Sequence, residues 1–258
     1  MKPFKISVVI PSYNKVKYVR QTLDSIFLQK YPNLEVIIQD GGSTDGTLKI
    51  IKEFAKKYPR IIKWESKGDK GQLDAINKGF GEAGGDILTF INADDVYEKE
   101  AFDSVAEAYS KNQSALWFVG RGVVMDEKGK EIARAITLYK NLLLLINKYC
   151  LLLITNYLMQ PSVFIARGAY EEYGPFNGTK NFITEYDLWL KLGIIQMPVI
   201  INKNLSVFRI ESSTKTKRMY NEILKEDERL INRYSNNRFI LSFHKLHNLG
   251  RILIGRFV

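Results

Sequence analysis

The first 110 or so residues alternate short apolar runs with amphipathic segments, and this alternation restricts the fold more than any other feature of the sequence. Residues 6–10 have the length of a buried strand, and the apolar residues between Val16 and Phe27 recur at helical spacing. Further helices are predicted over residues 47–58, 71–83 and 98–110. Strands that alternate with helices of this length form βαβ units, so we predict a doubly wound α/β domain with a mainly parallel sheet.

Acidic residues follow three of the predicted strands. Asp40 follows residues 34–39, Asp69 lies in the loop after residues 61–65, and the buried run 86–91 leads into Asn-Ala-Asp-Asp. In an open parallel sheet, ligands bind beyond the carboxyl ends of the strands, so these acids would converge on one pocket. Ordinary turn chemistry explains any one of them alone. Together they predict a pocket that suits a metal ion and a diphosphate.

The pattern changes after residue 115. Residues 116–125 are predicted to form a long strand, and residues 131–135 a returning strand after a turn, which indicates an antiparallel edge. Residues 138–158 are rich in leucine, but two lysines and three asparagines interrupt them. Lysine is costly inside a bilayer, so we expect a buried or interfacial helix there rather than a membrane span.

The number of cysteines and the first residues of the chain indicate the cellular compartment. Cys150 is the single cysteine, which excludes a disulfide framework and a thiolate metal cluster. The first residues run straight into a strand and lack the apolar stretch of a secretory signal. We therefore expect a cytoplasmic location.

The net charge of +10 is unevenly distributed. Residues 202–258 hold 12 Lys plus Arg against 5 Asp plus Glu, which is +7 for this segment. Basic charge attracts nucleic acid, sugar nucleotides and anionic lipid alike, and does not choose among them.

The last segment, residues 238–258, combines apolar residues at near-helical spacing with basic residues. This pattern is typical of a basic amphipathic helix on a membrane surface. A terminal helix that docks on the protein's own core has the same period, so both interpretations stay open. His244 and His247 lack an acidic or cysteine neighbour, and we interpret them as ordinary residues of this helix.

Three motifs follow the first, second and fourth predicted strands in order: Pro-Ser-Tyr-Asn at 11–14, Asp-Gly-Gly-Ser at 40–43 and Asn-Ala-Asp-Asp at 92–95. With the later segments, this set resembles the family 2 inverting glycosyltransferases of GT-A fold, of the bacterial cell-surface polysaccharide type. The resemblance implies a GT-A domain over residues 1–211, with a nucleotide-binding half of about 1–115 and an acceptor-side half of about 116–211. A basic helical extension over 212–258 would follow.

By this resemblance, Asp40 would bind the nucleotide base, and Asp69 and Asp74 would lie near the base and ribose. The full set implied for the nucleotide sugar is Pro11, Tyr13, Asn14, Asp40, Asp69, Asp74, Asp94 and Arg209. Asp95 would bind Mn²⁺ or Mg²⁺, which bridges the diphosphate, and Asp94 would meet the ribose or the metal. Asn92 stands where many members have a further Asp.

The resemblance also implies a catalytic base, because the attacking hydroxyl must lose its proton. Glu185 occupies the place of the usual Asp before a Leu-Trp helix, and Asp187 is the second candidate. Gln160 and Trp189 fall on the acceptor side. Glu211 stands where some members have His.

The function implied is inverting, metal-dependent transfer from a nucleoside-diphosphate sugar, with UDP as the expected nucleotide, to a hydroxyl of a glycan or lipid-linked glycan. Residues 238–258 would add peripheral contact with the cytoplasmic face of an anionic inner membrane. A non-catalytic sugar-nucleotide or polysaccharide-binding protein is the alternative. A sugar nucleotidyltransferase would need a Gly-rich basic loop where residues 11–14 stand, and the clustered acids would repel nucleic acid.

Overall fold

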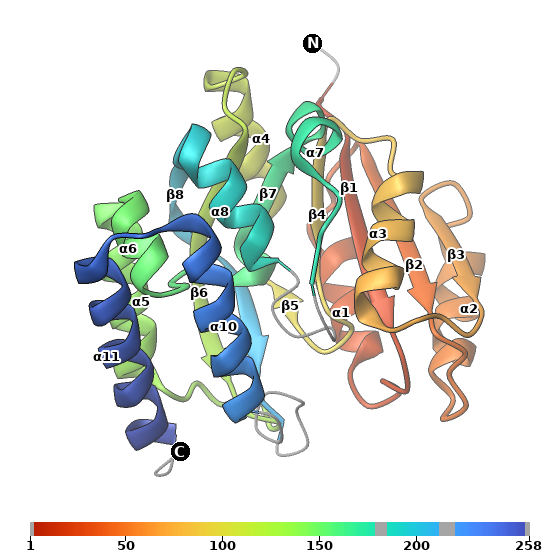
Figure 1. Ribbon diagram of the computed structural model, residues 1–258. Helices are drawn as coiled ribbons and strands as arrows, with labels where there is room; N and C mark the ends of the chain where they lie inside the picture. The colour runs from red at the N-terminus through yellow and green to blue at the C-terminus, as the bar shows by residue number, and fades with distance from the viewer. Residues whose placement is uncertain (1–2, 179–184, 212–219, 256–258) are drawn as a thin grey trace.

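The computed structural model describes residues 3–178, 185–211 and 220–255 of the chain. Helices cover both faces of one mixed sheet, and two further helices lie at one side of the molecule (Figure 1). The strands are β1 (Ile6–Ser12), β2 (Leu34–Asp40), β3 (Ile62–Ser66), β4 (Ile87–Phe90), β5 (Val96–Tyr97), β6 (Trp117–Met125), β7 (Val163–Ala166) and β8 (Val199–Arg209). The helices are α1 (Val19–Phe27), α2 (Thr47–Lys57), α3 (Gln72–Glu82), α4 (Ala101–Lys111), α5 (Arg134–Ile146), α6 (Tyr149–Ile154), η1 (Gln160–Ser162), α7 (Arg167–Tyr173), α8 (Tyr186–Ile195), α10 (Tyr220–Tyr234) and α11 (Arg238–Gly255).

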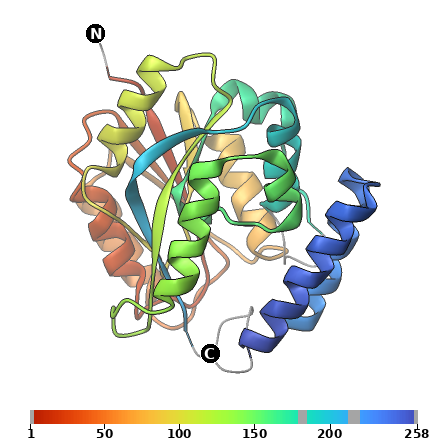
Figure 2. The same cartoon turned by 90° about the vertical axis from the view of Figure 1, so that its left-hand side faces the viewer.

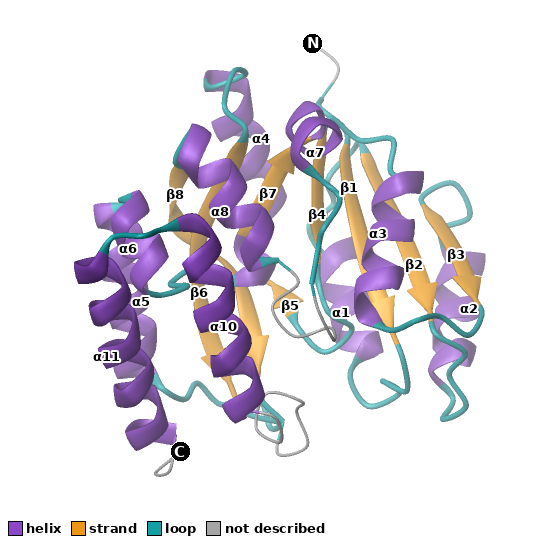
Figure 3. Ribbon diagram, in the orientation of Figure 1, coloured by secondary structure: helices purple, strands orange, loops and turns teal. Residues whose placement is uncertain are grey.

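The sheet has the order β3-β2-β1-β4-β7-β6-β8-β5, and its first four strands are parallel. These strands alternate with α1, α2 and α3 along the chain, which confirms the doubly wound half (Figure 3). The apolar runs of β1 and β4 are wholly buried, as strands covered by helices on both faces require. The carboxyl ends of β1 to β4 therefore meet at one edge of the sheet.

The second half of the sheet is mixed. β7 pairs antiparallel with both β4 and β6, β8 runs parallel to β6, and the short β5 closes the edge antiparallel to β8. The expected antiparallel strand over residues 131–135 is wrong: only Glu131 forms an isolated bridge with Met125, and α5 begins at Arg134. The leucine-rich stretch is two helices, because the chain turns at Asn147, which has a positive φ of 49°.

Two apolar layers fill the space between the sheet and the helices. On one side, α3 packs on β1 and β2; on the other, Val19, Leu23 and Ile26 of α1 pack on the same strands. Trp117 and Trp189 stack in the first layer with ring centroids 5.7 Å apart. This double cover fixes the sheet and with it the positions of the loops at its carboxyl edge.

The two C-terminal helices pack beside α6 and α8 rather than on the sheet. The expected boundary between domain and extension falls in residues 212–219, outside the described residues, and the division stays a prediction. Within the described ranges, no helix has the length and apolar character needed to cross a membrane.

Candidate active site

Loops after β1 and β2 are tied together at the carboxyl edge of the sheet. The N–H of Asn14 donates to Ser43 Oγ at 2.8 Å, and the N–H of Thr44 donates to Asn14 Oδ1 at 2.9 Å. Asn14 has φ 51°, a left-handed conformation that Asn tolerates well. These two hydrogen bonds hold the neighbouring Tyr13 beside the β2 loop, and its side chain is 62% exposed. Pro11, in contrast, is buried in β1.

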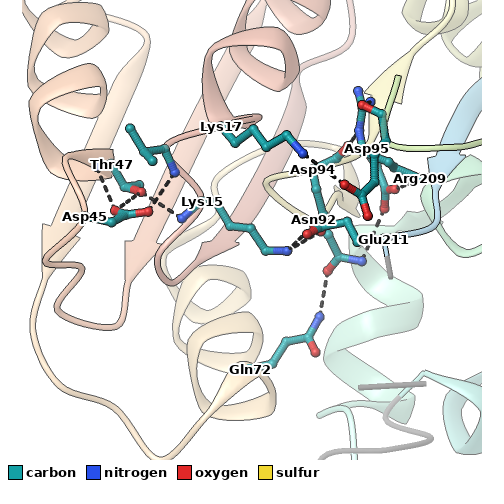
Figure 4. A network of polar contacts seen from close by, with 12 residues as sticks. Lys15, Lys17, Asp45, Thr47, Gln72, Asn92, Asp94, Asp95, Arg209 and Glu211 are labelled. Atoms are coloured by element: carbon teal, nitrogen blue, oxygen red, sulfur yellow. Dashed lines mark hydrogen bonds and ion pairs between the residues drawn. The ribbon is translucent and has the colours of Figure 1, made fainter. Parts of the chain in front are cut away.

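Lys15 joins two carboxylates that are far apart in the sequence. Its Nζ donates to Asp94 Oδ2 at 2.5 Å and to Glu211 Oε1 at 2.7 Å (Figure 4). Asp94 follows β4, and Glu211 lies just beyond the end of β8. The three side chains thus bring the β1, β4 and β8 ends to one point.

The charges at this point are strongly perturbed. Burial alone would lower the pKa of Lys15, but Asp94 and Glu211 outweigh it and the pKa is raised, so the ammonium is charged at neutral pH. Burial raises the pKa of Asp94 although Lys15 opposes the shift. Two largely buried carboxylates side by side therefore need a cation, which Lys15 supplies.

Asp95 does not face this point. Its side chain is fully buried: Oδ1 accepts the Arg209 N–H at 2.8 Å, and Oδ2 accepts the Asn92 side-chain amide at 3.2 Å. Burial, followed by the neighbouring Asp94, raises its pKa well above the ordinary value. This geometry engages each carboxylate oxygen of Asp95 in one contact that holds the loop, and its role as a metal ligand stays a prediction.

Arg209 is also an interior residue. Its Nε donates to the Asp94 carbonyl at 2.8 Å, one terminal nitrogen donates to Gln21 Oε1 at 2.7 Å, and its guanidinium lies over the Tyr18 ring at 4.6 Å. It is 3% exposed. The expected contact with a diphosphate does not fit these contacts; Arg209 holds the acidic loop against β8.

Asp40, Asp69 and Asp74 accept hydrogen bonds from, or form ion pairs with, groups close to them. Asp40 accepts the Ser43 N–H at 2.9 Å and the Ser66 hydroxyl at 2.7 Å, and it therefore joins the two loops. Asp69 accepts the Gly71 N–H at 2.8 Å, and Asp74 pairs with Lys78 one turn on at 2.8 Å. All three shape the loops at the carboxyl edge of the sheet, and their roles toward a base and ribose stay predictions.

The two acceptor-side residues behave differently. Gln160 donates to the Phe90 carbonyl at 2.8 Å, while its Oε1 is buried without a hydrogen-bond partner. Trp189 is 1% exposed and stacked on Trp117, so it is core and does not contact an acceptor. Its predicted acceptor role does not fit this burial.

Glu185 and Asp187 flank the start of α8 and have different surroundings. Asp187 is 4% exposed and accepts from Tyr234 Oη at 2.7 Å and Lys191 Nζ at 3.0 Å, so it anchors α10 on α8. Glu185 is half-buried, and its charge reaches Lys140. Burial, with Arg251 nearby, lowers the pKa of Lys140 to about 8, and Glu185 opposes that shift. The preceding residues 179–184 of the expected base motif lie outside the described residues.

The donor set fits a hard divalent ion in part. Asp94 and Glu211 each present a carboxylate oxygen to one cation, Lys15. Mg²⁺ and Mn²⁺ accept one or two carboxylates and take their other ligands from phosphate and water. No cluster of three His, Cys, Asp or Glu residues suited to a metal occurs in the described part of the chain. A metal bound here would need further oxygen ligands from phosphate or water, and it would displace Lys15 Nζ from the two carboxylates.

Sequence reasoning missed Lys15 and the partnership of Glu211 with Asp94. Lys15 directly follows the Pro-Ser-Tyr-Asn motif, and that position was the available signal. Gln72 was also missed: its amide donates to Asn92 Oδ1 at 2.6 Å and so links α3 to the acidic loop. Both contacts join segments that no local pattern connects.

The parallel half of the sheet, with acids at its carboxyl edge, has the arrangement of α/β proteins that bind ligands at that edge. The model of the family described as "Glycosyl transferase family 2" matches residues 7–174, which is more than half of the 258 residues. The chain belongs to this family, and its fold is the expected GT-A fold.

Curated relatives share parts of the chain. It is 31% identical over 122 residues to "Putative teichuronic acid biosynthesis glycosyltransferase TuaG" of Bacillus subtilis, a match over 47% of this chain and 48% of that protein. It is 31% identical over 151 residues to "Glycosyltransferase GlyA" of Streptococcus pneumoniae, over 54% of this chain and 21% of that protein. The match covers between 21% and 48% of the length of these and several other relatives, so they are two to five times as long as the matched segment.

Solved structures show the same fold. A mannosyltransferase of Pyrobaculum calidifontis in complex with GDP-Man and Mn²⁺ superposes with a TM-score of 0.72 and 18% identity, over 99% of this chain and 74% of that one. Staphylococcus aureus TarS in complex with UDP-GlcNAc gives a TM-score of 0.66 and 17% identity, over 96% and 72% of the two chains.

Proposed function

We propose that the protein transfers a sugar from a nucleoside-diphosphate sugar to a hydroxyl group of a glycan or lipid-linked glycan, with inversion at the anomeric carbon. The observation that carries this proposal is the meeting of Lys15, Asp94 and Glu211 at the carboxyl edge of a family 2 sheet. Ligands of open α/β sheets bind at that edge. The complexes of two structural neighbours with UDP-GlcNAc and GDP-Man support this donor class.

The donor would lie across the β1 to β4 loops. Tyr13 is exposed beside the β2 loop and offers a ring for stacking on the base, and Asp40 and Asp69 shape the base and ribose end. The diphosphate would lie near Lys15. UDP is the nucleotide we propose.

Asp94 and Glu211 would hold the divalent ion, Mn²⁺ or Mg²⁺. A metal at that place, when bound, neutralises charge on the departing nucleoside diphosphate. Lys15, released from the two carboxylates, would remain within reach of the same phosphates as a second positive charge. The chain thus holds its own cation at the leaving-group end of the pocket.

Glu185 would be the catalytic base. Its Oε takes the proton of the acceptor hydroxyl while the hydroxyl oxygen bonds to the anomeric carbon and the bond from that carbon to the diphosphate oxygen breaks. A single displacement of this kind inverts the configuration. Asp187 is less suited, because Tyr234 and Lys191 occupy its carboxylate. Orientation of the two substrates supplies much of the acceleration.

The acceptor class is proposed from the relatives. One is named for teichuronic acid biosynthesis, and another, from Methanococcus voltae, is named as a transferase acting on a dolichyl sugar phosphate. The first name gives a polysaccharide and the second a lipid-linked sugar. We propose a similar acceptor, modified at the cytoplasmic face of a membrane.

A non-catalytic sugar-nucleotide-binding protein is the second candidate. The observation that favours it is Asn92, which is committed to Gln72 and Asp95 and supplies no charge. Product formation separates the two functions.

The test begins with thermal stabilisation by sugar nucleotides in Mn²⁺, Mg²⁺ or EDTA, because a ligand of the native state raises the unfolding midpoint. The stabilising donor is then used to measure transfer and the anomeric configuration of the product. We expect Glu185→Gln to keep donor binding and lower kcat by about 10²-fold or more. Asp187→Asn is the matched variant, and its main effect should be on stability. If Glu185→Gln keeps full kcat, Glu185 is not the base; if no donor binds, the proposed class fails.

A further inference from the structure

Helix α11 has a docked face and a free face. His244 and Asn248 are at most 2% exposed, and His244 Nδ1 donates to the Ile154 carbonyl on α6 at 2.9 Å. On the other face Phe239, Phe243 and Leu246 are 78%, 56% and 64% exposed. Their spacing of four and three residues places them in one stripe along the helix. The docked face confirms the interpretation of a helix packed on the protein's own core, and the membrane interpretation stays a prediction for the free face.

Helix α5 continues this free apolar face. Its exposed residues Leu138, Leu142 and Leu145 follow helical spacing, and each is more than half exposed. Tyr139 stacks on His247 with ring centroids 6.0 Å apart, so α5 and α11 are neighbours. Figure 2 shows both helices on the side of the molecule that faces the viewer. We call the exposed faces of these two helices the α5–α11 surface.

Basic charge predominates on this surface. The sequence contains no Asp or Glu from residue 133 to 158 or from residue 235 to 258. Lys148 and Arg238 are exposed along these segments, and so are Arg134 and Lys245. Acids lie at its margins, where Glu131 pairs with Arg134 at 3.1 Å and Glu228 of α10 lines a hollow with Lys245. Exposed Phe and Leu side chains therefore stand among an excess of basic residues.

We propose that the α5–α11 surface docks the protein on a bilayer that contains anionic lipid. Phe and Leu side chains would enter the boundary between headgroups and acyl chains, and the four basic side chains would meet lipid phosphates. A second copy of the chain fits less well, because two such surfaces would bring their excess of basic residues together. The proposal uses no residue of the donor site, so it stands or fails independently of the transfer reaction.

Vesicle sedimentation of the full chain tests the proposal, with phosphatidylcholine vesicles that contain or lack phosphatidylglycerol. We expect binding to the anionic vesicles, weaker binding to neutral ones, and a decrease as salt is raised. Absence of binding to anionic vesicles overturns the proposal. Sedimentation velocity without lipid is measured in parallel, and a dimer that the surface variants below dissociate assigns the surface to a second copy instead.

Three variants locate the surface. We expect Phe239→Ser with Phe243→Ser, Leu138→Ser with Leu142→Ser, and Arg238→Glu with Lys245→Glu each to lower vesicle partitioning by about tenfold or more. Circular dichroism and the unfolding midpoint confirm that each variant is folded. The α5 variant is decisive, because unchanged binding there would reduce the site to α11 alone and overturn the two-helix surface.

Matched controls lie across the molecule. Leu28→Ser with Trp64→Ser removes exposed apolar residues near α1 and on β3, and Lys49→Glu with Lys56→Glu makes the same change of net charge on α2. Both should bind vesicles as the unaltered protein does. Equal losses in controls and surface variants would mean that overall charge and apolarity, not the α5–α11 surface, cause the binding.

Discussion

Lys15 shows how one residue determines the character of the pocket. Its Nζ holds Asp94, after β4, at 2.5 Å and Glu211, after β8, at 2.7 Å. An ammonium in that position occupies space that a divalent ion would need. Lys15 would therefore compete with a divalent metal ion for the two carboxylates.

Replacement of Lys15 tests that balance. We expect Lys15→Met to bind Mn²⁺ about tenfold more tightly than the unaltered protein, because it removes a positive charge beside two carboxylates. Calorimetric titration of Mn²⁺ into the protein without donor measures this affinity. Lys17→Met is the control, since Lys17 is exposed and pairs with Glu127. Equal Mn²⁺ affinity in all three proteins would show that Asp94 and Glu211 are not the metal ligands.

At the scale of single elements, β2 carries a buried charge that joins it to its neighbours. Glu35 accepts the Ser7 hydroxyl at 2.6 Å and the Gly84 N–H at 2.7 Å, and pairs with Lys5 and Lys63. Burial alone would raise the pKa of Glu35, but these contacts outweigh it and lower the pKa to about 2.

This shift predicts a pH dependence. A lowered pKa in the folded state stabilises the protein above the ordinary pKa of Glu, and this stabilisation is lost as the pH falls from about 4.5 towards 2. We expect Glu35→Gln to lower the free energy of unfolding by about 2 kcal/mol at neutral pH, with the difference from the unaltered protein shrinking through that window. Urea unfolding at several pH values measures it. Glu53→Gln, in an exposed pair with Arg20, should change little; a difference for Glu35→Gln that does not vary with pH would contradict the assignment.

The contact between α3 and β1 depends on a glycine. A Cβ at Gly79 would lie 2.3 Å from Val9 Cγ1 in the core, whereas a Cβ at Gly81 of the same helix would meet nothing within 4 Å. We expect Gly79→Ala to destabilise the protein by roughly 1–3 kcal/mol through overpacking. Gly81→Ala should be neutral or stabilising, because Ala favours helix. Thermal unfolding compares the two, and equal midpoints would refute the close approach.

At the scale of the whole molecule, Asp187 connects the sheet domain to the C-terminal helices. Tyr234 Oη of α10 donates to its carboxylate at 2.7 Å, and Asp227, His244 and Arg251 form a buried polar cluster between α10 and α11. These contacts set the position of the α5–α11 surface relative to the pocket.

Removal of one hydroxyl tests this connection. We expect Tyr234→Phe to lower the free energy of unfolding by about 1–2 kcal/mol, because Asp187 loses a hydrogen bond to a buried charge. Urea unfolding measures the change, and hydrogen exchange should show faster exchange in α10 than in β1. Unaltered stability and exchange would mean that α10 is held by apolar contacts alone.

Local pattern predicted the nucleotide-binding half well. The period of the apolar residues identified β1, β2, β4 and their helices, because strands covered on both faces must be apolar along their length. Local reasoning fails at residues 131–135, because the turn before them predicts a returning strand and the chain instead enters α5 at Arg134. The local sequence has only a weak preference for strand or helix there, so tertiary contacts determine the secondary structure.

Periodicity and motif order were enough to predict the family, the parallel half of the sheet and the edge at which the acids gather. Which of those acids meet Lys15 and which are held inside the loop became visible only once the chain was folded. Asp94 and Asp95 are adjacent in the chain, yet Arg209 N–H captures one and Lys15 the other. Side-chain direction at such a loop depends on partners 79 and 114 residues away in the chain, and no local pattern encodes it.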